Sequence, residues 1–177
     1  ACALRAAAAG RVLSALATGY IKPSDTSAGA QFGSAVAASS DGKTVALGAP
    51  LANGEAGTVY VFIAPVAGPV LAPNPIKISA PSAQAMHFGA SVALSEDGNT
   101  LVVGAPFDSN AQRGVGTYPA APNTNAAHSG AVFVYSRTGN AFSATPVYIK
   151  ATDADMGDEF GSVVALSDVP VPSTYRY

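Results

Sequence analysis

The densest group of carboxylates in the sequence lies near its C-terminal end, at Asp153, Asp155, Asp158 and Glu159. Closely spaced carboxylates of this kind could hold a divalent cation such as calcium, which prefers oxygen ligands. The corresponding stretch ahead of Phe88, residues 82–87, contains no carboxylate. We therefore expect these four residues to form a solvated loop, and we expect no metal or other cofactor; a cation bound at this loop is the alternative.

Candidates for catalytic chemistry are few. The chain has two histidines, and we expect His87 to sit partly buried at a rim. His128 adjoins Ser129, but a serine nucleophile needs a base and an orienting acid that are brought together in space. No Gly-x-Ser-x-Gly elbow is present, and we expect Asp41 and Asp97 at turn tips rather than facing each other as in a glycosidase. We expect no catalytic residue and no enzyme activity.

Composition excludes several classes of function. The net charge is −2, and nine basic residues are scattered along the chain, so we expect no nucleic-acid binding. One cysteine allows neither an intrachain disulfide nor a cysteine cluster for zinc. No apolar run approaches the roughly 18–20 residues that span a bilayer. The 18 glycines and 13 prolines favour many short elements joined by tight turns.

A sequence unit occurs twice and begins a third time. Its first two copies align without a gap over nineteen residues, from Phe-Gly through Asp-Gly to Gly-Ala-Pro. The shared motif residues are Phe32, Gly33, Asp41, Gly42, Gly48, Ala49 and Pro50 in the first copy, Phe88, Gly89, Asp97, Gly98, Gly104, Ala105 and Pro106 in the second, and Phe160 and Gly161 in the third. The connection that follows is six residues long in the first copy (51–56) and 23 in the second (107–129). A length difference confined to one loop is typical of repeat architectures.

Each unit predicts four short strands. Two of them flank the Asp-Gly pair, which predicts a type I′ turn with positive φ at both residues. A third strand, at 59–62 and again at 132–135, is β-branched and aromatic throughout, so we expect it to be buried on both faces. The fourth contains Ile76-Lys77 and its counterpart Ile149-Lys150. Four strands in a unit of roughly 56–72 residues predict a propeller blade.

Phe-Gly followed at this distance by Gly-Ala-Pro resembles the FG-GAP repeat, the blade unit of integrin α-subunit propellers and of many bacterial surface proteins. The stretch 123–130 is similar to the bacterial variety in particular. The resemblance covers about residues 20–167 and implies an all-β, partial β-propeller of four-stranded antiparallel blades. Many repeats of the family carry a calcium loop of spaced aspartates, but residues 39–43 and 95–99 offer too few carboxylates for one.

We divide the chain into an Ala-rich leader at 1–19, helical or disordered, and propeller blades at 20–177. The blade boundaries are about 20–75, 76–148 and an incomplete 149–177. Two blades and part of a third cannot close a ring, so this division predicts a fragment of a larger propeller.

The resemblance implies a non-catalytic scaffold, secreted or at the cell surface, that works in adhesion or in protein or glycan binding. The long connection at 107–129 is our candidate contact surface, because long loops on rigid scaffolds often carry function; a mobile decoration is the alternative. Further blades or another chain are expected at the open sheet edges. Two other functions stay open: part of a propeller hydrolase or lyase whose catalytic residues lie in other blades, and a truncated gene product without a function of its own.

Overall fold

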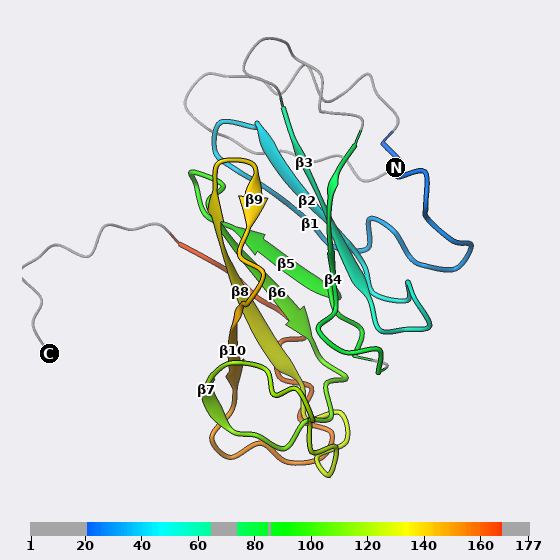
Figure 1. Ribbon diagram of the computed structural model, residues 1–177, viewed down its shortest axis with the longest axis vertical. Coiled ribbons are helices and arrows are strands. Elements are labelled where there is room, and N and C mark those ends of the chain that lie inside the picture. The colour runs from blue at the N-terminus through cyan, green and yellow to red at the C-terminus, as the bar shows by residue number, and fades with distance from the viewer. Residues whose placement is uncertain (1–20, 65–73, 85, 168–177) are drawn as a thin grey trace, which may run out of the picture.

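The computed structural model describes residues 21–64, 74–84 and 86–167. These residues form ten β-strands and no helix, arranged in two antiparallel sheets; in Figure 1 the first sheet lies at the upper right and the second lies beside it, to the left and lower. The predicted all-β fold is therefore confirmed, and the two sheets are consistent with two blades of a partial propeller. The predicted leader at 1–19 lies outside the described residues. Within the described ranges, no helix is long and apolar enough to cross a membrane.

The first sheet contains four strands in chain order. They are β1 (Val36–Ala38), β2 (Thr44–Ala49), β3 (Thr58–Ile63) and β4 (Ile76–Ser79). As predicted, β3 is buried on both faces, because it lies in the middle of the sheet and its side chains alternate between two apolar layers. Every side chain from Thr58 to Phe62 is buried.

The second sheet repeats this order and extends it. Its strands are β5 (Ser91–Leu94), β6 (Thr100–Ala105), β8 (Ala131–Thr138) and β10 (Val147–Lys150), with β7 (Gly114–Gly116) beyond β10 and β9 (Ala141–Phe142) paired to the end of β8. Strand β7 comes from the long connection after β6. The extra residues of the second unit therefore supply a fifth strand at the outer edge of the sheet.

One hydrophobic core joins the two sheets. The first sheet contributes Ala46, Val59, Val61 and Ile78, and the second contributes Leu101, Val103, Phe133, Tyr135 and Tyr148. Phe88 lies fully buried between them, with its ring edge-on to Phe133 at 5.5 Å. The far face of the first sheet packs against the segment that contains Ile21, Ala30 and Phe32, and the far face of the second sheet packs against Val164. Blade-on-blade packing is thus the main source of apolar burial.

The Asp-Gly turns differ from the predicted type. Only the glycines have positive φ, +69° at Gly42 and +67° at Gly98. The two aspartates keep negative φ because each carboxylate accepts bonds from its own loop, as described below. The type I′ prediction was wrong; Ser39 instead closes a turn by accepting the Gly42 amide at 3.0 Å, with the glycine in the left-handed conformation.

Sequence repeat and sheet are offset by one strand. Strand β4 pairs with β3 and so lies in the first sheet, although the predicted division at residue 76 assigns it to the second unit. Ile76 lies opposite Val61, and Val147 lies opposite the equivalent Val134. The counterpart of Ile76-Lys77 is therefore Val147-Tyr148 rather than Ile149-Lys150. When the alignment of a strand shifts by two residues, every side chain stays on the same face of the sheet. The pattern of Ile and Lys therefore did not reveal that the two strands were aligned wrongly.

Candidate functional site

The repeat motif lies at the joint between blades. The Phe88 carbonyl packs against Gly57 at the start of β3, and the Phe88 amide donates to the Ala56 carbonyl at 3.1 Å. The Gly89 carbonyl lies against Gly48, the glycine of Gly-Ala-Pro, so closely that a Cβ there would overlap it. Gly48 and Gly57 are thus needed because two backbones approach each other where a side chain would stand.

The start of the third unit makes the same joint with the second blade. Phe160 bridges to Gly130 as Phe88 does to Gly57, and the Gly161 carbonyl lies against Gly104. The Phe160 ring, however, is 36% exposed, whereas the Phe88 ring is fully buried. The described residues therefore contain one complete blade joint and the first contacts of another.

The hairpin aspartates brace their own turns. Asp41 accepts hydrogen bonds from the Ser39 hydroxyl at 2.7 Å and from the Lys43 amide at 2.9 Å. Asp97 accepts equivalent bonds from Ser95 and Asn99, and those bonds hold its pKa below the ordinary value. At Asp41, desolvation acts to raise the pKa of the carboxyl group. The hydrogen bonds from Lys43 and Ser39 outweigh it, so the pKa of Asp41 is also lowered.

The four candidate metal ligands do not converge. Asp158 accepts a hydrogen bond from the Asp155 amide at 2.7 Å, and Asp155 lies 3.6 Å from the Arg113 guanidinium. Asp153 and Glu159 are exposed. Across residues 21–64, 74–84 and 86–167, no three His, Cys, Asp or Glu side chains are grouped to hold a metal ion. The calcium alternative therefore gains no support from this loop.

The two histidines stack on one phenylalanine. The His87 ring lies 3.9 Å from the Phe107 ring, and the His128 ring lies 4.3 Å from its other face. His87 also approaches the Glu55 carboxylate of the preceding blade, at 3.6 Å. The Ser129 hydroxyl donates to the Ala126 carbonyl at 2.7 Å, so it is turned to the backbone and not to an imidazole. The arrangement is a rim contact between connections, as expected for His87.

A buried polar cluster was missed at the sequence level. The Lys150 ammonium lies 2.9 Å from the Asp108 carboxylate, and the two side chains are 0% and 1% exposed. The Tyr148 hydroxyl donates to the same carboxylate oxygen at 3.1 Å and accepts from the Asn110 amide at 3.3 Å. Lys150 also donates to the Gly130 carbonyl at 2.9 Å. This cluster, Asp108, Asn110, Tyr148 and Lys150, ties the start of the long connection to β10 and to the start of β8.

Burial controls the titration of this cluster. Burial lowers the pKa of the Lys150 ammonium, an effect that its hydrogen bond to the Asp108 carboxylate partly opposes. It raises the pKa of the Tyr148 and Tyr118 hydroxyls, and the Asp108 charge adds to the rise. The cluster residues therefore bond to one another and are closed off from solvent.

The long connection is exposed between its anchors. Gln112, Arg113, Val115 and Thr117 face solvent, with Val115 74% exposed. Strand β7 holds this segment against β10, and Arg113 donates to the Ala154 carbonyl at 2.8 Å. The connection is thus a fixed projection of the second blade rather than a loose loop.

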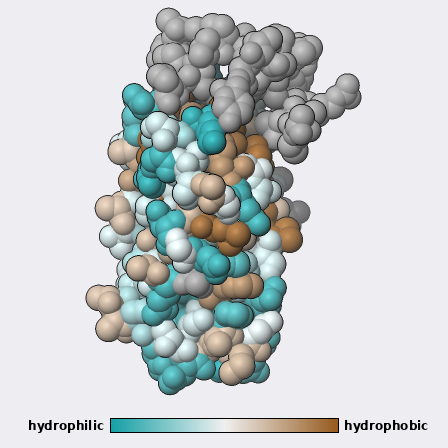
Figure 2. All heavy atoms as spheres, turned by 90° about the vertical axis from the view of Figure 1, so that its right-hand side faces the viewer, coloured by the Kyte–Doolittle hydropathy of each residue, from teal (hydrophilic) through white to brown (hydrophobic). Residues whose placement is uncertain are grey.

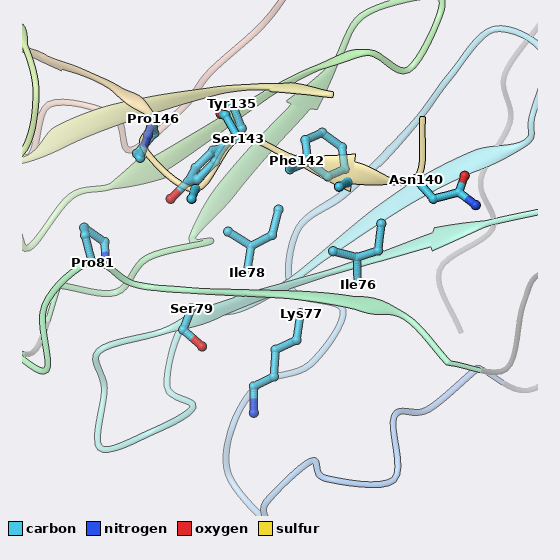
Figure 3. A pocket seen from close by; sticks show the side chains of 12 residues that line it. Ile76, Lys77, Ile78, Ser79, Pro81, Tyr135, Asn140, Phe142, Ser143 and Pro146 are labelled. Atoms are coloured by element: carbon cyan, nitrogen blue, oxygen red, sulfur yellow. The ribbon is translucent and has the colours of Figure 1, made fainter. Parts of the chain in front are cut away.

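A groove of about 370 Å³ lies between the blades beside β4. Figure 3 shows Ile76 and Ile78 pointing toward Phe142 and the β8–β9 hairpin, whereas Lys77 points away. Tyr135 and Pro146 close the far wall. In the space-filling view of the right-hand side of Figure 1, the strongest hydrophobic colour gathers near the middle and upper part of the molecule (Figure 2). The apolar lining of the groove, from Ile76, Ile78 and Phe142, is suited to binding.

A scan against protein-family models matches the chain at residues 18–62 and 77–135, together more than half of its length, to the FG-GAP repeat. The chain belongs to the FG-GAP repeat family. This confirms the resemblance given by Phe32-Gly33 and its copies, and it makes the two sheets part of a propeller-type repeat scaffold. A search of curated proteins found no match.

The two FG-GAP units of this chain are unequal. The position of Asp108 is occupied by Ala52 in the first unit, and the position of Lys150 by Ser79. The ion pair is therefore specific to the unit that carries the long connection. A carboxylate directly after Phe107, present in that unit alone, was the available sequence signal for it.

Proposed function

We propose that this FG-GAP chain is a non-catalytic binding scaffold that acts outside the cell, at its surface or secreted, in adhesion to protein or glycan. The observation that carries the proposal is the buried Asp108–Lys150 pair, which fixes a solvent-facing connection to the second blade. A fixed loop loses little conformational entropy on binding, so it favours recognition. The motif residues are occupied by blade packing, which leaves the connections as the variable surface.

The test is binding of the 177-residue chain to immobilised glycans and extracellular-matrix proteins. We expect saturable binding to at least one of them. A triple variant, Gln112→Ala, Val115→Ser and Thr117→Ala, should weaken it at least tenfold. A control with Ser136→Ala and Thr138→Ala changes exposed residues of the same blade away from the connection and from the groove, and it should bind within twofold of the parent.

Both variants keep Asp108 and Lys150, so melting temperature should differ little from that of the parent chain. Absence of saturable binding on every surface would contradict the proposal. Equal loss in the triple variant and the control would also contradict it, because the connection would then have no special part in binding.

A further inference from the structure

The outer edge of strand β4 is not paired with another strand of the described residues, whereas the equivalent edge of β10 pairs with β7. The first sheet ends at β4, and none of the described residues forms a strand beyond it. In the second sheet, β7 occupies the position beyond β10. The difference arises because the first unit connects β2 to β3 in eight residues, 50–57, too few to reach around to the outer strand.

The two outer strands correspond residue by residue. Tyr148 pairs with Gly116, and Lys150 pairs with Gly114. Since Val61 and Val134 are equivalent in the repeat, the β4 counterparts of Tyr148 and Lys150 are Lys77 and Ser79. The edge of β4 that corresponds to the covered edge of β10 is therefore formed by the backbone of these two residues.

The backbone groups of Lys77 and Ser79 point away from the sheet. The Ala80 amide donates inward to the Gly57 carbonyl at 3.3 Å. Successive residues of a strand alternate in the direction of their N–H and C=O groups. Lys77 and Ser79 therefore face outward, and an unpaired row of this kind is a template for a further strand.

The groove beside β4 provides room for the side chain of such a strand. Ile78 points into it, toward the β8–β9 hairpin that carries Phe142 (Figure 3). A residue paired directly opposite Ile78 projects on the same side of the sheet, so its side chain would enter the groove. The apolar walls favour an apolar side chain at that position, between two small residues that allow close backbone approach.

We propose that β4 binds an extended peptide segment of a partner protein as a fifth antiparallel strand, with small residues opposite Lys77 and Ser79 and an apolar residue opposite Ile78. The chain's own Gly114-Val115-Gly116, which occupies the matching place on β10, is the template for this pattern. None of residues 107–129 lines the groove, so the site is separate from the connection in the proposed function.

The experiment uses an acetylated and amidated peptide, Gln-Arg-Gly-Val-Gly-Thr-Tyr, with the sequence of residues 112–118. It is titrated into the isotope-labelled 177-residue chain and followed by NMR. We expect the amides of Lys77, Ile78 and Ser79 to shift. N-methylation of either glycine removes an amide that faces β4 and should weaken binding at least tenfold. N-methylation of the valine changes an amide that faces outward and should leave binding within twofold.

A pair of protein variants tests the same edge. Ser79→Pro removes one outward N–H, a change that sheet edges tolerate, and should weaken peptide binding at least tenfold. Ser79→Ala keeps the N–H and should bind within twofold. If the proline variant is unfolded by circular dichroism, the peptide series still decides, because it uses the unaltered chain. Absence of shifts, shifts confined to residues 147–150, or equal effects of the three N-methyl groups would overturn the proposal.

Discussion

At the scale of single residues, Asp108 and Lys150 form the most demanding contact in the described part of the chain. Both charges are almost completely removed from water, so their attraction must offset two desolvation penalties. The Tyr148 hydroxyl and the Gly130 carbonyl add the hydrogen bonds that such a pair requires. Removing one partner would leave the other charge buried without compensation.

Lys150→Met should therefore lower the free energy of unfolding by about 3–5 kcal/mol. Lys43→Met is the matched control, since Lys43 pairs with Asp41 at 3.5 Å on the surface, where its side chain is 61% exposed. That change should cost less than about 1 kcal/mol. Urea unfolding followed by circular dichroism measures both. Similar values for the two variants would show that the buried pair has no special role.

The sequence predicted the motif positions but not this pair. In the sequence, Asp108 is simply the first polar residue of the long connection. Lys150 was matched to Lys77, which lies partly exposed and pairs with Asp25 at 2.6 Å. Distinguishing the two lysines requires the strand register. Side-chain alternation fixes the face of a residue, but a slip of two positions leaves that pattern unchanged.

At the scale of elements, the joint between blades depends on glycines that meet a neighbouring backbone. Gly48 and Gly104 have ordinary φ values, so their requirement is steric and not conformational. Gly48 lies against the carbonyl of Gly89, and Gly104 lies against the carbonyl of Gly161 in the following unit. A rigid backbone cannot move aside as a flexible side chain can, which explains why the repeat keeps these positions small.

Gly48→Ala should lower the free energy of unfolding by about 1–3 kcal/mol, because the added methyl group overlaps the Gly89 carbonyl and forces the blades apart. Gly116→Ala serves as the control: its nearest neighbour is the end of the Gln112 side chain at 3.8 Å, so the change should be nearly neutral. Thermal melting compares the variants. Equal melting temperatures for the two would contradict a steric joint.

The four strands that the two units share, and the burial of the third, were predictable because each unit carries its own turn residues and apolar runs. The turn type was not, since the side chains of Ser39 and Asp41 close the loop through bonds that Asp-Gly alone does not specify. The fifth strand β7 was also unpredicted. Gly114–Gly116 has almost no apolar pattern and becomes a strand because β10 offers it an edge.

At the scale of the whole molecule, the core should make the fold sensitive to alkali. Burial raises the pKa of Tyr118, Tyr135 and Tyr148 above the ordinary value of 10.0. Burial also raises the pKa of Tyr60, so the folded state keeps four tyrosine protons that the unfolded chain releases near pH 10. A raised folded-state pKa stabilises the fold below the unfolded value, and this contribution is lost as the pH rises above it.

We expect the melting temperature to fall steeply above pH 10, together with a rise in tyrosinate absorbance as the chain unfolds. Tyr135→Phe removes the tyrosine whose pKa is raised by burial alone, and it should make the fall less steep. Circular dichroism and absorbance on the same samples measure both. Gradual ionisation of all tyrosines without unfolding would contradict the expectation.

The offset between repeat and sheet has a consequence for how such a molecule grows. A duplication that copies one sequence unit, from Ile76 up to the start of the next outer strand, carries the last strand of one sheet and the inner strands of the following one. The copied piece does not contain all the strands of one sheet. Its first strand pairs in the preceding sheet, and its own sheet is completed by the first strand of the next unit. Each added unit is thereby joined to its neighbours by backbone hydrogen bonds between strands. The step that lengthens the array also connects the new unit to it.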